Sequence, residues 1–488
     1  MMDAVATACA AGVSALDRGA HEEARAHFAD ALERAPTLLD VRLLVAFALA
    51  RAGDGDRARA VLDDTPAIAQ LVERDARRLA DAAVGLKALH AARAAVTTAL
   101  GFAPRDATLH ATLGALADRA GDPRADHHLD RALALDPTLI AALLTRAHRH
   151  AARDEWARAL HTLDTAVKTA PDHALARYQR GLLLLTLGRF EDGWRDAEAR
   201  RSLAWHQHAT PKGIPAWGGQ PLAGRTLLVW GEQGLGDQVQ FARFLPALAA
   251  ASGATLAVRV APPLVDLLAP LLPAHAHIAP LGDDVRADAH VPMMSLPALL
   301  GLHDEWAFTR APYLPVPAPA ITAATSRARA RIGICWAGNP AHAHDHARSL
   351  PLDAVRTLID GVDAEWISLQ VGAPEHARCA DPVLGARISA GASLGTTMRE
   401  TAQCIASLDR VVTADTAVAH VAAALGVPTT ILVPSLPDWR WQRERIDSPW
   451  YAAATLARRG RDESWNAVCG RVARTLPGYR AVSVGVAA

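Results

Sequence analysis

The feature that most constrains this chain is a proline that returns at a near-constant interval. Pro36, Pro104, Pro137 and Pro171 each end a stretch with helical spacing of apolar residues, and they are separated by 68, 33 and 34 residues. The first interval is twice 34, so one member of the series is missing. Because proline ends a helix, and a period of roughly 20–50 residues is typical of stacked repeats, the pattern predicts a helical solenoid.

A pattern of small, small, large and small side chains recurs at fixed distances before these prolines. Two antiparallel helices can approach closely only where small residues face each other, so the spacing predicts stacked helical hairpins. The recurring positions are Gly12, Ala24, Phe28 and Ala31 before Pro36, and Ala147, Ala159, Leu163 and Ala166 before Pro171. The pattern resembles the tetratricopeptide (TPR) repeat over about residues 5–205, in roughly six units with the last near Gly181. The resemblance implies a concave face that binds a peptide or a partner chain; an irregular Ala-rich bundle is the alternative.

Beyond Trp205 the helical period gives way to short apolar runs that alternate with amphipathic stretches. Short apolar runs bounded by turn residues are typical of buried strands. Strand candidates are 225–230, 255–260, 277–279, 289–291, 331–336, 366–370, 410–413 and 429–433, and helix candidates are 239–251, 262–272, 352–359, 398–408 and 417–425. Strands that alternate with helices predict parallel sheets covered on both faces. The predicted fold class is therefore an α-solenoid followed by an α/β region with two Rossmann-like lobes.

Segments rich in Gly, Pro and His mark the boundaries between these parts. The stretch after Trp205, HQHATPKGIPAWGGQPLAG, is expected to be a connector, and LPVPAPA at 314–320 is expected to lie at a hinge. The predicted domains are TPR repeats at 1–205, a connector at 206–224, an N-terminal lobe at 225–314, a hinge linker at 315–330 and a C-terminal lobe at 331–488.

Charge, cysteine usage and apolar run length exclude several classes of protein. Lys and Arg number 51, as do Asp and Glu, so no net charge favours a nucleic acid. The five cysteines form no CxxC pair, which predicts reduced, buried thiols rather than disulfides or a zinc site. The apolar runs fall far short of the roughly 20 residues that span a bilayer, and the first residues lack the basic segment of a secretory signal. We expect a cytoplasmic protein without a transmembrane segment.

A loop with three glycines, GEQGLGD, follows the first strand candidate of the α/β region. In open α/β sheets, ligands bind at the carboxyl ends of strands, where the next helix presents unpaired N–H groups. Gln233, Gly234 and Gly236 belong to this loop, whose glycines permit close approach of a ligand, and Asp237 stands where the helix starts. Its carboxylate can take the proton of an attacking hydroxyl, or it is only an N-cap. The loop fits neither the GxGxxG nor the Walker pattern.

A second strand end carries Asp415, Thr416 and Ala417, with His420 four residues after the threonine. At this spacing Thr416 and His420 share one face of a helix. The hydroxyl, the free amides of the helix start and the imidazole would converge on a diphosphate, whose charge the helix dipole favours. An Asp-Thr pair that only caps the helix, with a structural histidine, is the alternative.

The residues around both strand ends resemble a known enzyme family. GLGDQVQFARFLPAL and ADTAVAHVAAALGVPTTILVP resemble the signature regions of the heptosyltransferase-like (family nine) glycosyltransferases of GT-B type. The tail PDWRWQRERIDSPWY resembles a segment common in bacterial proteins that join TPR repeats to such a domain. The resemblance covers about residues 225–475. It implies that Asp237 is the general base and that Asp415, Thr416 and His420 contact a sugar nucleotide.

The resemblance also points to the loop after the strand at 331–336, WAGNPAHAHDHARSLPL, as a source of phosphate contacts. Asn339, Arg348 and Ser349 are the candidates in this loop, and Arg348 is the better cation for a phosphate. One position departs from the family, because Ala417 stands where heptosyltransferases commonly have glycine. Its methyl group narrows the approach of a phosphate.

The mechanism that the resemblance implies is inverting and independent of metal, with the nucleotide sugar as co-substrate and no further cofactor. An acceptor hydroxyl would lose its proton to Asp237 while the second lobe stabilises the departing nucleoside diphosphate. Closure of the lobes about the hinge would exclude water.

Two further groups of side chains have alternative interpretations. His342, His344 and His346 could form a metal site with Asp345, but nothing in the loop fixes its geometry, so no metal is expected. An aromatic group could stack on a nucleobase or a sugar ring, although packing between the lobes is the favoured interpretation. It comprises Trp439, Trp441, Trp450 and Tyr451.

Two functions from different classes agree with these observations. The favoured one is a glycosyltransferase whose TPR repeats hold the acceptor, a protein segment or a glycan. The alternative is a non-catalytic TPR interaction scaffold with a degenerate transferase-like domain, which Ala417 and the absence of lysine from the phosphate loop support. A third function, that of a nucleotide-sugar epimerase, is less favoured because it assigns no role to the TPR repeats.

Overall fold

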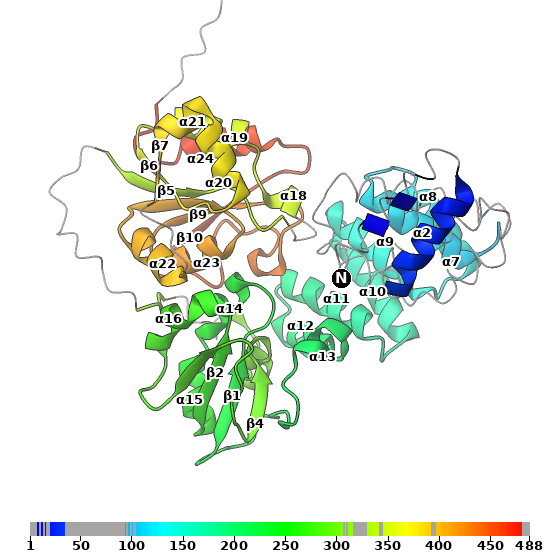
Figure 1. Ribbon diagram of the computed structural model, residues 1–488, viewed down its shortest axis with the longest axis horizontal. Helices are drawn as coiled ribbons and strands as arrows, with labels where there is room; N and C mark the ends of the chain where they lie inside the picture. The colour runs from blue at the N-terminus through cyan, green and yellow to red at the C-terminus, as the bar shows by residue number, and fades with distance from the viewer. Residues whose placement is uncertain are drawn as a thin grey trace, which may run out of the picture. The chain divides into compact units, whose positions relative to one another are not determined.

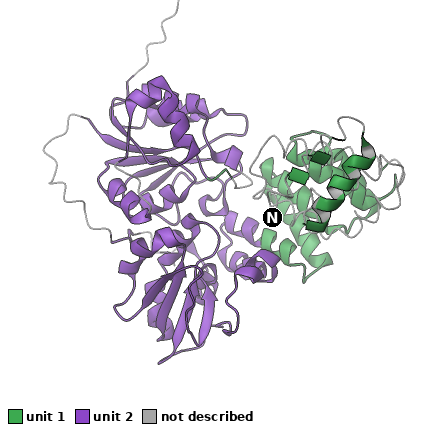
Figure 2. Ribbon diagram, viewed as in Figure 1, with its two compact units in different colours: residues 1–180, 339–344 green, residues 181–338, 345–488 purple. Residues whose placement is uncertain are grey.

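The structure is a computed structural model of the 488-residue chain (Figure 1). It describes residues 20–34, 104–305, 308, 311–315, 329–340, 345–391 and 397–480, with a few single positions between 7 and 100. The chain forms two compact units, residues 1–180 with 339–344 and residues 181–338 with 345–488 (Figure 2). Cys9, Pro36, His342, His344 and most of the predicted hinge at 315–330 lie outside the described residues.

The first unit is a series of helices that pack as antiparallel hairpins, α7 on α8 and α9 on α10. A Cβ atom at Gly114 of α7 would lie 2.7 Å from Leu129 Cγ of α8, so a small residue is required where these helices meet. The helices are α2 (His21–Arg34), α7 (Ala107–Arg119), α8 (Ala125–Leu135), α9 (Ile140–Ala152) and α10 (Trp156–Thr169), and α11 (Ala174–Thr186) continues into the second unit. The predicted helical repeat region is confirmed.

One arginine joins three of these helices. Arg149 of α9 donates to Asp118 Oδ1 of α7 at 2.5 Å and to both carboxylate oxygens of Asp126 on α8 at 2.8 Å. Only 12% of its side chain is exposed. Because a bidentate arginine–carboxylate pair fixes geometry as well as charge, Arg149 sets how one hairpin stacks on the next.

After the end of α11, the second unit contains three short helices, which are followed by two parallel sheets and their helices. The helices α12 (Phe190–Ala197), η1 (Glu198–Ser202) and α13 (Ala204–Ala209) share this unit with the sheets, although the sequence pattern assigned residues up to 205 to the repeats. The first sheet has the strand order β3-β2-β1-β4. Its strands are β1 (Thr226–Trp230), β2 (Thr255–Val260), β3 (His277–Pro280) and β4 (Ala289–Pro292), and its α-helices are α14 (Leu235–Ala242), α15 (Leu245–Ser252), α16 (Val265–Leu268) and α17 (Leu296–Leu299).

The second sheet has six parallel strands in the order β10-β9-β8-β5-β6-β7. They are β5 (Arg331–Cys335), β6 (Glu365–Ser368), β7 (Ile388–Ala390), β8 (Arg410–Ala414), β9 (Thr429–Val433) and β10 (Ala454–Arg458). The helices of this lobe are α18 (Asp345–Arg348), α19 (Leu352–Asp360), α20 (Ala373–Ala380), α21 (Pro382–Arg387), α22 (Met398–Ala406), α23 (Ala417–Ala424), η6 (Trp439–Trp441) and α24 (Trp465–Ala473). The strand order reverses between β5 and β8, and the carboxyl ends at such a reversal are where open α/β sheets bind ligands.

The predicted fold class and strands are confirmed, but two predicted helices are wrong. The helix expected at 239–251 is two helices, α14 and α15, because Pro246 fits only the first turn of a helix. The helix expected at 262–272 consists of three short turns, η2 (Pro262–Leu264), α16 and η3 (Ala269–Leu271), since prolines interrupt it. The short strands β7 and β10 and the helix α24 had no prediction.

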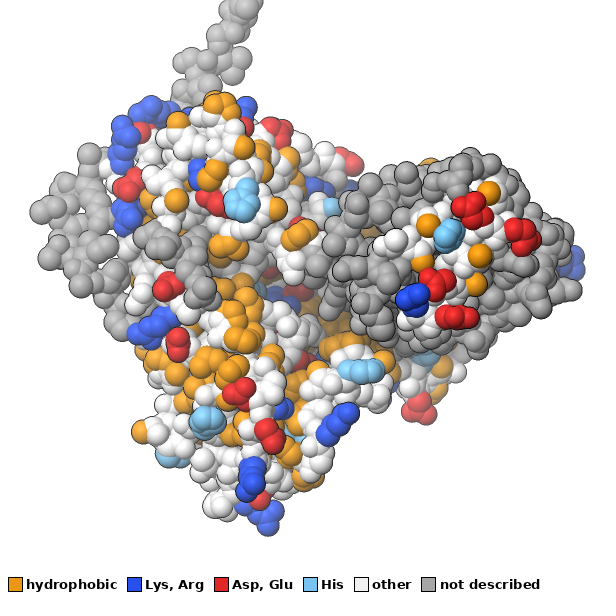
Figure 3. Space-filling view, in the orientation of Figure 1, with side chains coloured by type: hydrophobic (Ala, Val, Ile, Leu, Met, Phe, Trp, Pro, Cys, Tyr) orange, Lys and Arg blue, Asp and Glu red, His pale blue; other side chains and the backbone are white. Residues whose placement is uncertain are grey.

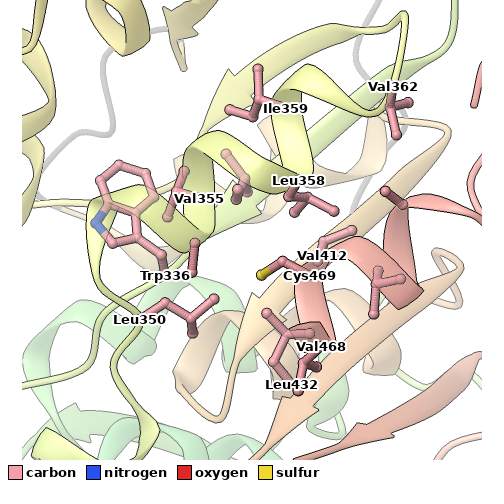
Figure 4. Packing of buried hydrophobic residues seen from close by; sticks show 14 of the residues in the cluster. Trp336, Leu350, Val355, Leu358, Ile359, Val362, Val412, Leu432, Val468 and Cys469 are labelled. Carbon is pink, nitrogen blue, oxygen red and sulfur yellow. The ribbon is translucent and has the colours of Figure 1, made fainter. Parts of the chain in front are cut away.

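The second lobe has a core in which two helices cover one face of the sheet. α19 packs on α24, and Figure 4 shows Leu358 of α19 close to Val468 and Cys469 of α24, above Val412 and Leu432 of the sheet. All five are at most 2% exposed. This core fixes the strands whose carboxyl ends carry the candidate site.

The surface of the described residues shows no single dominant charge. On the face in Figure 3, acidic and basic side chains are interspersed rather than gathered in one basic patch. Among the helices of the described residues, none is long and apolar enough to cross a bilayer. Cys335 and Cys469 are buried thiols as expected, but Cys379 is exposed, which corrects the prediction for that residue.

Truncation of Leu358 to alanine is expected to destabilise the protein by about 2–5 kcal/mol, because it leaves a cavity in a closed core. The free energy of unfolding, measured with urea, checks this. Val383→Ala is the matched control, since Val383 lies on α21 of the same lobe and is 41% exposed; it should change the stability by less than about 0.5 kcal/mol. Equal effects of the two variants would contradict the assignment of the core.

Candidate functional site

The loop between β1 and α14 places Asp237 in the first turn of a helix. Gly234 is the N-cap of α14, and Asp237 is its third residue. Asp237 Oδ2 accepts a hydrogen bond from the Gly234 N–H at 2.6 Å, which satisfies a backbone group that would otherwise lack a partner. Asp237 is therefore not the N-cap itself, and its other oxygen faces away from the loop backbone.

That second oxygen meets a cation from the other lobe. Arg440, in η6, forms an ion pair with Asp237 Oδ1 and a hydrogen bond with Gln240 Oε1 of α14. Within its own lobe Arg440 donates to Asp438 Oδ1 at 2.8 Å, and it is 5% exposed. Burial raises the pKa of the Asp237 carboxyl above its ordinary value, although the Arg440 charge opposes this shift. Because it pairs with Arg440, the Asp237 side chain faces the second lobe, and 17% of it is exposed.

The helices α14 and α23, which follow β1 and β8, touch at a glycine. A Cβ atom at Gly236 would lie 2.6 Å from His420 Cδ2 and 3.5 Å from Ala417 Cα. The absence of a side chain at Gly236 therefore lets the start of α14 lie directly on the start of α23. This contact brings Asp237 and the Asp415–His420 segment, which are far apart in the sequence, to one place.

His420 is held by aromatic side chains of its own lobe. Its Nδ1 lies 2.9 Å from the Tyr451 hydroxyl, and its ring centroid lies 5.4 Å from that of Trp441. The residue is 4% exposed. Burial, reinforced by the Arg440 charge, lowers the pKa of His420 well below its ordinary value. The imidazole is therefore neutral at neutral pH and acts as a hydrogen-bonding group rather than a cation.

Arg348, the last residue of α18, contacts the residue that precedes the N-cap of α23. It donates from Nη1 to the Asp415 carbonyl oxygen at 2.9 Å and from Nε to Asp345 Oδ1 at 3.0 Å. Thr416 is the N-cap of α23, and its side chain makes no cap hydrogen bond. The first N–H groups of a helix lack intrahelical partners, so this corner combines a guanidinium, a hydroxyl and free amides. Such a combination suits an anion.

Asp415 is the most perturbed carboxyl of this corner. Burial, reinforced by the charge of Asp438, raises its pKa to about 6. Asp415 thus carries a proton in part of its population near neutral pH. A protonated carboxyl can donate a hydrogen bond to an anion, whereas an ionised one only accepts.

Other predicted site residues lie apart from this corner or point elsewhere. Ser349 donates to Asp345 Oδ2 at 2.8 Å and accepts from the Gly338 N–H at 3.0 Å, so it shapes the loop that carries Arg348. Asn339 belongs to the first compact unit. Gln233 is exposed, with a left-handed backbone (φ 60°). Within the described ranges, no group of three or more His, Cys, Asp or Glu residues could hold a metal ion.

The aromatic residues near the carboxyl end of the chain pack between the lobes. Trp439 and Trp450 lie against Phe241 of α14, with ring centroids 6.3 and 6.5 Å away, and Trp450 stacks on Phe308 at 4.2 Å. Trp194 of α12 meets Trp439 edge to face at 5.3 Å. The packing interpretation is the one that the structure shows.

Sequence reasoning missed two arginines that cross between the lobes, Arg440 and Arg243. Arg243, at the end of α14, donates to the Trp450 carbonyl oxygen at 2.6 Å, and its guanidinium lies 4.5 Å from the Tyr451 ring centroid. The signal for Arg440 was its place between Trp439 and Trp441 in the WRW segment, because an arginine among buried tryptophans must itself be buried and paired.

Two segments of the chain match the models of known protein families. Residues 15–82 match the family model of the tetratricopeptide repeat, and residues 391–438 match that of glycosyltransferase family 9 (heptosyltransferase). The second match contains β8 and α23, and with them Asp415, Thr416 and His420. Both resemblances inferred from the sequence are confirmed.

Several known proteins are similar to this chain over part or most of its length. Protein FlbA of Caulobacter vibrioides is 28% identical over 414 residues, which cover 78% of this chain and 69% of FlbA. The structure of E. coli ADP-heptose LPS heptosyltransferase II has 18% identity and a TM-score of 0.35, and the match covers 51% of this chain and 97% of that chain. That of an O-GlcNAc transferase variant of Thermobaculum terrenum has 15% identity and a TM-score of 0.30, with coverage of 83% and 90%.

Substitution of Gly236 by alanine is expected to cost about 1–3 kcal/mol of stability, because the new methyl group meets a buried histidine that Tyr451 holds in place. The midpoint of urea unfolding measures the effect. Gly470→Ala in α24 is the matched control: its nearest neighbour would be Thr357 Cγ2 at 3.9 Å, and alanine in a helix should gain roughly 0.5–1 kcal/mol. Stabilisation by both substitutions would contradict the close contact of α14 with α23.

Substitution of Asp415 by asparagine should reveal its raised pKa. Between about pH 4 and about pH 6 the folded protein binds more protons at Asp415 than the unfolded chain, so this group makes the wild type less stable as the pH rises. The variant lacks this loss. We expect its stability relative to wild type to increase by on the order of 1–3 kcal/mol from about pH 4.5 to about pH 7.5 in urea titrations.

The control for this experiment has the opposite sign. Asp381 caps α21, and hydrogen bonds from the Leu384 and Val383 N–H groups lower its pKa. Asp381→Asn should therefore lose stability relative to wild type as the pH rises through the ordinary carboxyl range. A pH-independent difference for Asp415→Asn, beside the expected trend for Asp381→Asn, would show that Asp415 titrates normally.

Proposed function

We propose that this chain, which carries TPR repeats and a glycosyltransferase family 9 domain, moves a sugar from a nucleotide-sugar donor to an acceptor hydroxyl. One observation carries the proposal: Asp237, in the first turn of α14, pairs with Arg440 of the second lobe, next to the point where Gly236 meets the anion-suited start of α23. A base on one lobe and a diphosphate-binding corner on the other are the two parts that a direct displacement at an anomeric carbon requires.

The proposed reaction is a single inverting displacement. The acceptor oxygen attacks the anomeric carbon and gives its proton to Asp237, while the bond from that carbon to the phosphate oxygen breaks and the nucleoside diphosphate leaves with the electron pair. Each oxygen of Asp237 already accepts one hydrogen bond, from Gly234 or from Arg440. A carboxylate oxygen has a second lone pair, so the partly exposed carboxylate can still accept the acceptor hydroxyl.

The departing diphosphate would be stabilised by the α23 corner without a metal. The amides at the helix start, the Thr416 hydroxyl and Arg348 supply hydrogen bonds and positive charge. His420 would contribute a neutral donor: if the Tyr451 hydroxyl donates to Nδ1, the ring proton lies on Nε2. Ala417 is the first residue of α23, so its methyl group would lie beside the bound phosphate.

The acceptor is proposed to bind to the helical repeats as a polypeptide segment, with a glycan as the alternative. A cavity of about 500 Å³ in the first unit is lined by apolar and polar groups that would suit a peptide. They are Thr97, Leu100, Pro104, His110, His127 and Arg131. The Nδ1 atom of His110 is buried and has no hydrogen-bond partner among the described residues, so a bound peptide could supply one.

A second candidate function is that of a non-catalytic scaffold, because the candidate site residues already form contacts within the protein. Both oxygens of Asp237 are bonded within the protein, and His420 is buried against Tyr451 and Trp441. These contacts also agree with a transferase-like domain that has no activity and serves a TPR interaction scaffold. The two functions differ in whether the α23 corner binds a nucleoside diphosphate.

The substitution Asp237→Asn tests whether Asp237 is the base, because it removes the charge and keeps the size of the side chain. We expect release of nucleoside diphosphate from a panel of nucleotide sugars to fall by about 10²–10⁴-fold, while calorimetric binding of nucleoside diphosphate stays near wild type, because asparagine keeps the size of the side chain. Asp288→Asn is the matched control: Asp288 accepts from the Thr226 N–H at the opposite end of β1, and it should leave turnover unchanged.

Two outcomes would count against the enzyme. Full turnover in Asp237→Asn would remove this residue as the base. Absence of turnover and of nucleoside diphosphate binding in the wild type, across the whole panel, would favour the scaffold.

A further inference from the structure

The loop that carries Asp237 is anchored by a side chain outside the two lobes. Glu232 lies two residues after the end of β1 and is 5% exposed. Its carboxylate accepts a bidentate pair of hydrogen bonds from Arg200 of η1, at 2.6 Å to Oε1 and 3.2 Å to Oε2. Although burial alone would raise the pKa of Glu232, the Arg200 charge holds it below its ordinary value. The loop therefore begins at a fixed, ionised anchor.

Arg200 is buried within a network that satisfies its donors. Its side chain is 1% exposed, and besides Glu232 it donates to Glu198 Oε1 at 2.6 Å, to Ser295 Oγ at 2.9 Å and to the Ala197 carbonyl oxygen at 3.2 Å. A buried bidentate pair fixes the geometry of both side chains. Arg200 thus ties the segment after α12 to two points of the first lobe, the glycine loop and η4 (Met293–Ser295).

The backbone between the anchor and Asp237 occupies a strained conformation. Gln233 has a φ of 60°, the left-handed region that side chains other than glycine rarely adopt. Such a conformation persists only where its neighbours are fixed on both sides. Arg200 fixes Glu232 on one side, and on the other the Gly234 N–H is fixed by Asp237 Oδ2. Loss of the Arg200 anchor would let Gln233 relax and change where α14, and Asp237 with it, begins.

We propose that Arg200 is a positioning residue for Asp237, so that the segment at the end of the helical repeats shapes the base of the transferase. The inference rests on the proposed function for its kinetic consequence, but the structural link can be measured without activity. Because the donor is expected on the second lobe, displacement of Asp237 should lower kcat and leave the KM for the donor unchanged. A role in stability alone predicts neither that split nor a change confined to the loop.

The test compares Arg200→Met with a double variant. Removal of one partner leaves a buried charge alone, whereas replacement of both partners by apolar side chains of similar size is often tolerated. Arg200→Met/Glu232→Met should therefore recover the unfolding midpoint that Arg200→Met loses. If the ion pair positions the loop, the double variant should still show about a tenfold or greater loss of kcat and faster hydrogen exchange of the 231–237 amides.

Arg378→Met is the matched control. Arg378 is 3% exposed and forms a bidentate pair with Glu375 on α20 of the second lobe, so its loss should cost stability without faster exchange at 231–237. Arg200→Lys keeps the charge but loses the bidentate geometry, and it should fold with intermediate exchange. Wild-type exchange and kcat in the stable double variant would overturn the proposal. If the wild type has no turnover, the proposed function fails, and the exchange data alone decide whether Arg200 positions the loop.

Discussion

The ion pair between Asp237 and Arg440 is the interaction on which the arrangement of the second unit depends. A buried guanidinium must be paired, because an isolated charge in a protein interior is costly. Arg440 has partners in both lobes. Asp438 lies in the same lobe as Arg440, whereas Asp237 and Gln240 lie in the first lobe. The two lobes therefore satisfy one charge together, directly above the point where Gly236 lets α14 lie on α23. Asp438 and Gln240 remain as partners of the guanidinium when Asp237 is replaced by asparagine, so that variant does not leave Arg440 unpaired.

The same burial sets the protonation of the site. Asp237 and Asp415 both have raised pKa values, and that of His420 is lowered, and in each case burial is the largest cause. Burial disfavours the charged form of every such group, but for Asp237 the charge of Arg440 opposes this effect, and the two side chains form an ion pair. The start of α23 offers a ligand the Arg348 guanidinium, the Thr416 hydroxyl and the first amides of the helix, a combination that suits a diphosphate.

Much of this site could be predicted from the sequence because its parts are local. A short apolar run followed by a glycine loop or by Asp-Thr specifies strand, turn and helix within about fifteen residues, so Asp237, Asp415 and His420 were found at strand ends. Arg440 could not be found in this way, because it lies 203 residues from Asp237 and no local pattern relates the two. The pairing of Arg200 with Glu232, like the prolines that divide α14 from α15, depends on three-dimensional context.

The aromatic packing between the lobes limits how the site can open. Phe241, Trp439 and Trp450 are each at most 6% exposed, and a buried aromatic side chain removes about 150–250 Å² from water. At about 25 cal/mol per Å², exposing these three by swinging the lobes apart would cost on the order of 10 kcal/mol. That is comparable to the whole stability of a domain. This cost favours an arrangement in which the lobes stay joined at this cluster over full opening about the linker.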